Sequence, residues 1–150
     1  MIIETPLTDT IEDIVIEQML RNSRDVQQFW IPGEPVPNER PRIISRGGKS
    51  WAFTPTQTTK ARQHILNQVL LQQRKRMEPP YSVAVKFILS PTQKDSDVDN
   101  LQKLLFDALF SNKAAIPPMP FKDDKHILNL VCFKRVGPKP GIHLWVMKPL

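Results

Sequence analysis

A strand-like apolar run that leads directly into closely spaced carboxylates constrains this chain more than any other feature. Residues 81–89 (YSVAVKFIL) are rich in β-branched and aromatic side chains, a composition that favours a strand. Asp95, Asp97 and Asp99 follow at alternate positions, and an apolar helical pattern then covers about residues 98–110. The spacing predicts a strand and a helix joined by an acidic loop, which requires a fold that mixes both element types.

The sequence before this unit predicts two further helices and a hairpin. Helical patterns cover residues 10–28 and a stretch that begins at the capping pattern Thr54-Pro55-Thr56-Gln57, with Pro55 at the first helical position. Prolines within residues 29–44 exclude the interior of a central strand and favour an edge strand or an extended ribbon. The Gly47-Gly48 pair marks a hairpin turn after that segment.

Two more strands are expected near the C-terminus. Residues 127–135 form an apolar run, and residues 142–147 are expected to return antiparallel after a turn rich in glycine and proline. The element order predicts an α+β fold in a single domain, with a mixed β-sheet and two main helices on one face. We expect an N-terminal helical extension over residues 1–27 and the main domain over residues 28–150.

Charge is distributed unevenly along the chain. The formal net charge is +6, yet residues 1–27 carry −4, which leaves +10 for the remainder. A basic body indicates a polyanionic partner, although a surface with more lysine than glutamate would give the same balance without one.

The single cysteine and the absence of long apolar runs restrict the class of protein. Cys132 excludes an internal disulfide, and its apolar neighbours in the sequence predict a buried thiol. No segment has the pattern of a secretory leader or a membrane span, so we expect a cytoplasmic protein without membrane contact.

The spaced carboxylates have three candidate roles. A calcium loop of the EF-hand kind is excluded, because Asn100 stands where that loop needs glycine and Phe106 stands where it needs a closing glutamate. Helix capping by Asp97 and a first-turn position for Asp99 would make both acids structural. A divalent-metal site would explain why the acids occur together, provided that a third carboxylate arrives from residues 123–124.

The motifs resemble those of the RusA family of Holliday junction resolvases. Residues 97–103 (DVDNLQK) with 107–109 (DAL) resemble the central signature of that family. Flanking marks occur in the same order, with GEP at 33–35, RPR at 40–42 and KDD at 122–124.

The resemblance covers about residues 29–148 and includes three departures. Asn38 stands where the family usually has lysine, and the loop between Leu109 and Asp123 is longer than usual. Residues 1–27 have no standard counterpart in the family.

The resemblance implies a Mg²⁺-dependent, homodimeric endodeoxyribonuclease, encoded by a bacterium or a phage. Such an enzyme resolves four-way DNA junctions in recombination and repair by paired, symmetric hydrolysis of phosphodiesters, and Mn²⁺ is the expected substitute for Mg²⁺. The implied metal ligands are Asp97, Asp99 and Asp124, with Asp123 in reserve, and Lys103 is the implied catalytic or phosphate-contacting cation. Whether one or two ions bind stays open.

Cations flank the expected hairpin and the helix that follows it. We expect them to bind backbone phosphates, whereas simple solvation is the alternative for each. They are Arg40, Arg42, Arg46, Lys49, Lys60 and Arg62. Two other functions stay open: a protein that binds branched DNA without cutting it, and a nuclease that prefers forks or flaps.

Overall fold

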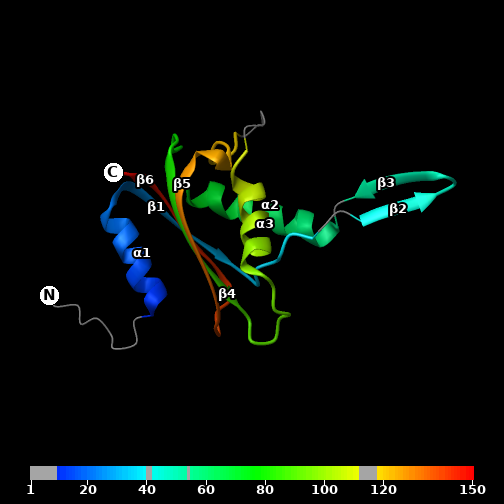
Figure 1. The fold of residues 1–150 in the computed structure, drawn as a ribbon, viewed down its shortest axis with the longest axis horizontal. Coiled ribbons are helices and arrows are strands. Elements are labelled where there is room, and N and C mark those ends of the chain that lie inside the picture. The colour runs from blue at the N-terminus through cyan, green and yellow to red at the C-terminus, as the bar shows by residue number, and fades with distance from the viewer. Residues whose placement is uncertain (1–9, 40–41, 54, 112–117) are drawn as a thin grey trace.

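The protein forms an α+β domain on one mixed sheet, from which a separate two-stranded ribbon projects (Figure 1). The computed structural model describes residues 10–39, 42–53, 55–111 and 118–150. For Arg42 and Phe53 it describes the backbone alone.

A four-stranded mixed sheet forms the centre of the domain. Its strands lie in the order β1 (Ser23–Pro32), β6 (Gly141–Pro149), β4 (Tyr81–Leu89) and β5 (Ile127–Val136). β6 runs antiparallel to both β1 and β4, whereas β4 and β5 are parallel. β4 is an inner strand covered on both faces, which explains why nearly all of its residues are buried and why its sequence shows no polar alternation.

Two helices cover one face of the sheet: α2 (Thr56–Gln72) and α3 (Val98–Leu109) (Figure 1). α3 turns an apolar stripe toward the sheet, and its buried members are Leu101, Leu104, Leu105, Phe106, Ala108 and Leu109. Each fully buried leucine contributes about 1.5–3 kcal/mol. This packing fixes the rotation of α3 and therefore leaves Asp99, Lys103 and Asp107 on its exposed side.

The remaining helix, α1 (Ile11–Arg21), packs on the opposite face of the sheet (Figure 1). Ile16 of α1 is buried there with Ala84, Trp145 and Met147. Lys86 projects from β4 on the same face and is largely buried, with its Nζ 2.8 Å from Oδ1 of Asp13 in α1. An apolar contact and an ion pair thus hold α1 on the sheet.

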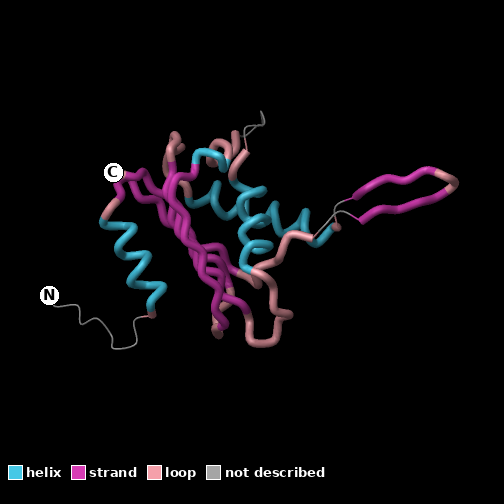
Figure 2. Tube along the Cα trace, viewed as in Figure 1, coloured by secondary structure: helices cyan, strands magenta, loops and turns pink. Residues whose placement is uncertain are grey.

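The expected hairpin forms a free-standing ribbon. β2 (Arg42–Arg46) and β3 (Lys49–Phe53) pair antiparallel through the Gly47-Gly48 turn, and the ribbon extends away from the sheet and helices (Figure 2). The prediction of a hairpin at this position is confirmed.

Strand β1 forms an interrupted edge of the sheet. Its pairing with β6 shifts between Arg24 and Gln27, where Asp25 has a positive φ of 52°, which is a β-bulge. Further along, the Gln72 side chain accepts a hydrogen bond from the Trp30 amide (3.0 Å) and donates one to the Trp30 carbonyl (2.8 Å). The backbone of β1 is therefore paired on its outer side at this point.

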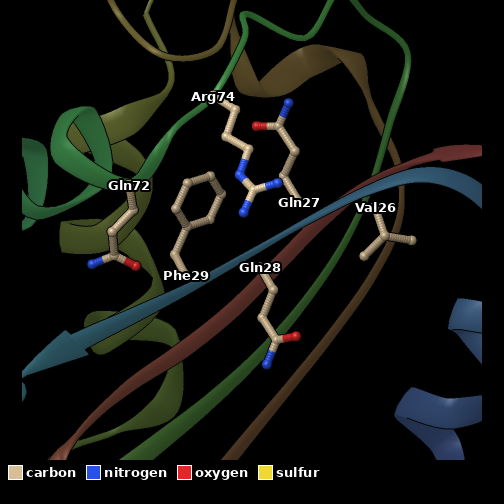
Figure 3. Close-up of a pocket in the computed structure, with 6 residues that line it drawn as sticks. All are labelled: Val26, Gln27, Gln28, Phe29, Gln72 and Arg74. Atoms are coloured by element: carbon tan, nitrogen blue, oxygen red, sulfur yellow. The ribbon is translucent and has the colours of Figure 1, made fainter.

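A cavity of about 320 Å³ lies beside the same edge (Figure 3). Arg74, just beyond the end of α2, reaches between the side chains of Gln27 and Phe29. The Gln27 side chain also donates a hydrogen bond to the Lys75 carbonyl (2.8 Å), so the segment after α2 is tied to β1.

The structure corrects the lengths of two expected helices. The helix expected over residues 10–28 ends at Arg21, because Asn22 caps it and Ser23 begins β1. The boundary expected after residue 27 consequently falls inside a strand of the main sheet. α2 begins at Thr56 rather than at Pro55, which takes the cap position without a side-chain hydrogen bond, and Thr54 lies outside the described residues.

The last two strands run in opposite directions, as expected, but they are not neighbours in the sheet. β6 lies between β1 and β4. β5 instead pairs in parallel with β4 after the crossover through α3, as a parallel connection requires. This difference decides where the acidic residues of the candidate site lie.

Candidate active site

The N-terminus of α3 presents two carboxylates. Asp97 occupies the N-cap position with an extended backbone, but its carboxylate makes no capping hydrogen bond. Asp99 lies exposed in the first turn, where the helix dipole stabilises negative charge. Capping therefore does not occupy the Asp97 side chain, and both acids are open to a ligand.

Asp97 borders a shallow pocket of about 420 Å³ between the start of α3 and the segment that precedes the ribbon. The Asn38 amide donates a hydrogen bond to the Asn100 carbonyl (3.0 Å), which holds that segment against the helix. Glu39 lines the pocket as well, a residue that the motifs did not single out. Its position beside the Arg-Pro-Arg mark is the one sequence signal that pointed to it.

Asp95 has a different environment from Asp97. Its Oδ1 lies 2.8 Å from Nζ of Lys134 in β5, and the same ammonium donates to the Ser96 carbonyl (2.9 Å). The hydrogen bond from Lys134 holds the pKa of Asp95 below its usual value. Lys134 thus neutralises Asp95 and anchors the acidic loop to the edge strand.

Lys103 lies one helical turn after Asp99 and is exposed. Within the described part of the chain, no ion pair joins Lys103 to Asp99 or Asp107. A local helix ion pair therefore does not account for this lysine.

The acids at residues 123–124 occupy different environments. Asp123 caps the short 3₁₀ helix η1 (Asp124–His126) by accepting a hydrogen bond from the Lys125 amide, and that bond lowers its pKa. Partial desolvation raises the pKa of Asp124, and the neighbouring Asp123 and Asp107 add to the effect. Asp123 is thus used structurally, and Asp124 is the carboxylate that would gain from a bound cation.

Asp124 lies beside the second half of α3. It lines a pocket of about 230 Å³ with Gln102 and Phe106 of that helix. Asp99 and Asp107 are eight residues apart in the sequence, which corresponds to about 12 Å along a helix. Figure 1 shows η1 at the end of α3 that is distant from its N-terminus.

The acids consequently form two groups, one at each end of α3. Among the described residues, no three histidine, cysteine, aspartate or glutamate side chains come together in a set that could hold a metal. The expected meeting of Asp97, Asp99 and Asp124 is therefore not formed within this chain. Asp97 follows the C-terminal end of β4, whereas Asp124 precedes the N-terminal end of β5. Because the two strands are parallel, these positions lie at opposite ends of the strands.

The expected DNA-binding cations occupy several positions. Arg46 and Lys49 lie at the tip of the ribbon, and Lys60 is exposed on α2. Arg62 is less exposed: its Nη2 donates to Oδ1 of Asn38 (2.8 Å) and lies 3.5 Å from Oδ2 of Asp107.

Arg62 therefore joins α2, α3 and the segment before the ribbon, besides any contact with DNA. Of the two remaining cations, Arg40 lies outside the described residues, and the side chain of Arg42 is not described.

The family model of endodeoxyribonuclease RusA matches residues 32–147. The chain belongs to the RusA family. RusA proteins are endonucleases of the Holliday junction resolvase type, which act on branched DNA. No protein with a curated description matches the sequence.

The RusA match covers the ribbon, both helices of the main face and every residue of the acidic groups. It leaves out α1 and nearly all of β1. Within the described residues, no helix combines the length and the apolar character needed to cross a bilayer. The candidate active site thus lies inside the part of the chain shared with RusA nucleases.

Proposed function

We propose that this RusA protein is a Mg²⁺-dependent endodeoxyribonuclease that resolves four-way DNA junctions by paired, symmetric hydrolysis. The observation that carries the proposal is the Asp97 carboxylate at the start of α3, unused by capping, followed by Asp99 and then by Lys103. These residue types supply what phosphodiester hydrolysis needs, because carboxylates bind a divalent cation and an ammonium group stabilises charge on phosphoryl oxygens.

The residues present fit a divalent cation only in a reduced form of the expected site. A site of three protein carboxylates does not fit the single chain, as the separation of the two acidic groups shows. Mg²⁺, however, is commonly held by one or two carboxylates together with substrate phosphates and waters. Asp97 and Asp99 meet that smaller requirement, and Mn²⁺ has the same preference for oxygen ligands. A bound divalent cation would supply charge neutralisation and water activation there.

Electrostatics supports a cation at this position. Two like charges 4 Å apart near a protein surface repel by about 4 kcal/mol. A DNA phosphate that approaches Asp97 and Asp99 therefore needs a positive charge close by. Lys103 provides one positive charge on the following turn of the same helix, and a bound cation would balance the second carboxylate.

The roles of the other site residues follow from their positions. We assign Lys103 to the phosphoryl oxygens, because its ammonium is exposed on the side of α3 that also carries Asp99. Asp124, with Asp123 in reserve, was the expected third ligand, but both lie at the other end of α3, so in this proposal Asp97 and Asp99 are the carboxylates of this chain that would hold the cation.

Symmetric cleavage requires two active sites. A four-way junction has near two-fold symmetry, so a two-fold homodimer would place one site on each of two equivalent strands. The cations on the ribbon and α2, Arg46, Lys49 and Lys60, are proposed to bind the backbone phosphates of the arms, together with Arg40 and Arg42.

A second candidate is a RusA protein that binds branched DNA without cutting it. The separation of the acidic groups favours this candidate, because it leaves the proposed cation with two protein carboxylates. Preference for forks or flaps is a further alternative within the nuclease class.

One experiment separates these functions. End-labelled four-way junction, fork, flap and linear duplex of equal arm sequence are incubated with the protein, with and without Mg²⁺. We expect paired nicks at symmetric positions of the junction, only with Mg²⁺. Binding of the junction without cleavage in Mg²⁺ or Mn²⁺ would support the second candidate. Faster cutting of forks or flaps than of the junction would show that those structures are the preferred substrate.

A further inference from the structure

The ribbon formed by β2 and β3 carries side chains that its own fold does not need. Ile43, Ile44 and Trp51 are exposed to 75%, 39% and 48% respectively. An isolated two-stranded hairpin is at best marginally stable in water. The ribbon extends away from the sheet and helices, so the main core does not cover these side chains (Figure 2).

The two faces of the ribbon differ in chemistry. Ile44 is opposite Trp51, and Arg46 is opposite Lys49 two pairs nearer the tip. Side chains of directly opposed residues, and of every second residue along a strand, share one face. One face therefore combines an indole, an isoleucine and two cations, and we call it the Trp51 face.

The opposite face is small and neutral by comparison. Ile43 is opposite Ala52, and the hydroxyls of Ser45 and Ser50 are hydrogen bonded to each other at 2.8 Å. This face carries no charge, and it provides a matched isoleucine, Ile43, for comparison with Ile44.

The turn of the ribbon has no side chain. Gly47 and Gly48 have positive φ angles of 60° and 75°, as a tight hairpin turn requires. A Cβ atom added at either position would meet no atom within 4 Å. The backbone at the tip can therefore approach another molecule closely, with Arg46 and Lys49 on its two sides.

We propose that the Trp51 face binds unstacked bases at the branch point of DNA, with the Trp51 indole stacked on a base. Residues 42–53 contain three cations and no acid. This positive charge is complementary to the phosphates of a nucleic acid, and it does not match a protein surface that lacks acidic residues. Lys49 is two residues from Trp51 and Arg46 two residues from Ile44, a spacing of about 7 Å along each strand, so both cations can bind backbone phosphates on one side of the stacked base.

A branch point is the occupant that fits this chemistry. Inside a continuous duplex the faces of the bases are covered by their neighbours, and a tryptophan side chain reaches one only by unstacking a base step, which costs a few kcal/mol. Where strands exchange, base faces are exposed, and aromatic or apolar side chains bind them. The inference rests on the proposed function, because it assigns to the ribbon the selection of branched over linear DNA.

The test compares variants on the two faces, with the full chain and without Mg²⁺ so that no strand is cut. Trp51→Ala, Trp51→Phe and Ile44→Ala change the Trp51 face, and Ile43→Ala is the matched control on the opposite face. Affinity is measured for a four-way junction and for a linear duplex of the same sequence, and thermal unfolding confirms that each variant is folded.

We expect Trp51→Ala to weaken junction binding about 5- to 150-fold, the range found when a stacked base loses its aromatic partner. Duplex binding should change less than about twofold, because phosphate contacts dominate it. Trp51→Phe should keep most of the affinity, and Ile43→Ala should behave like the wild type. Junction DNA should quench part of the tryptophan emission of the wild type but not of Trp51→Phe.

Three results would overturn the inference. Equal losses on junction and duplex would show that the ribbon binds a groove rather than unstacked bases. A lower oligomeric mass of Trp51→Ala without DNA would show that the face binds a second copy of the chain. Unchanged junction affinity would show that Trp51 makes no contact. A wild type that does not prefer the junction would instead refute the proposed function itself, whereas these three results leave it standing.

Discussion

Lys134 of β5 binds Asp95, with 2.8 Å between Nζ and Oδ1, whereas Asp97, two residues further on, has no such partner among the residues that the structure describes. In this loop, the Asp95 carboxylate is neutralised by an ion pair, whereas the Asp97 carboxylate is available to a ligand. Substitutions of these two residues can therefore be compared directly to test the role of Asp97.

Asp97→Asn should reduce junction cleavage by at least about 100-fold, a loss typical when a group that stabilises the transition state is removed. Junction binding should be unchanged or tighter, because a negative charge near the phosphates is lost. Asp95→Asn removes a similar charge from the same loop and should cut at close to the wild-type rate. Single-turnover cleavage and gel-shift affinity provide both readouts, and wild-type cleavage by Asp97→Asn would exclude Asp97 from the mechanism.

Lys103→Ala should slow cleavage by about 100-fold while leaving the thermal midpoint nearly unchanged. The ammonium is exposed and, among the described residues, has no ion-pair partner on α3, so the fold loses little. Lys103→Arg should recover part of the rate, because it restores the charge with different geometry. A rate within a few-fold of the wild type for Lys103→Ala would mean that another group stabilises the phosphoryl oxygens.

Lys60 and Arg62 should differ in what their removal changes. Lys60→Ala is expected to reduce the slope of log affinity against log salt by about 0.9, with unchanged stability, because one phosphate contact is lost. Arg62→Ala removes the hydrogen bond to Asn38 and the contact with Asp107. We expect it to lower the free energy of unfolding by about 1 kcal/mol. Equal salt slopes for Lys60→Ala and the wild type would remove Lys60 from the phosphate contacts.

Asp13→Asn should destabilise the domain in a pH-dependent way, because Lys86, only 9% exposed, would lose its carboxylate partner. We expect a loss of about 1–2 kcal/mol, less than for a fully buried pair, because water screens the half-exposed Asp13. The hydrogen bond from Lys86 holds the pKa of Asp13 below its usual value of 3.8.

The pH dependence of this loss has a definite sign. The stabilisation is complete above about pH 4 and is lost as the pH falls through the lowered pKa. Urea unfolding of wild type and variant should therefore differ at pH 7 and converge in acid. Glu17→Gln, which removes the exposed contact with Arg21, is the control and should show no such convergence. A constant difference between Asp13→Asn and wild type down to pH 2 would contradict the assignment.

The thiol of Cys132 should be unreactive in the native protein. Burial raises its pKa to about 12, and its Sγ lies 3.4 Å from Oε1 of Gln102 in α3. At pH 8 about one molecule in ten thousand would carry the thiolate. A thiol reagent should label the protein slowly in buffer and rapidly in denaturant, and rapid native labelling would indicate that β5 separates from α3.

Local patterns predicted the elements that are stabilised by their own side chains. The apolar run at 81–89 forms β4, the stripe after Asp97 forms α3 within one residue of the expected bounds, and the Gly-Gly pair closes the ribbon. The C-terminal end of the helix expected over residues 10–28 was predicted too late, because the apolar spacing continues through Val26. In the structure, Asn22 and Ser23 end the helix with local hydrogen bonds.

The arrangement of the acids could not be predicted in the same way. Asp97, Asp99 and Asp124 were recognised by motif, but their distances depend on whether β5 runs parallel or antiparallel to β4. Local sequence does not encode that direction. Glu39 and the neutralisation of Asp95 by Lys134 likewise depend on segments distant in the chain, and only the folded protein brings them together.

The Gln72 amide occupies the hydrogen-bonding positions at Trp30 that an incoming strand would use, and the bulge at Asp25 bends the same border of the sheet. Recruitment of another polypeptide by β-augmentation is thereby blocked along β1. At the opposite border, the part of the chain that the structure describes contributes no side-chain hydrogen bond to the backbone of β5 at Leu128 or Leu130, and these residues are exposed to 64% and 38%. A quaternary structure that extends the sheet would begin there, directly alongside Asp124.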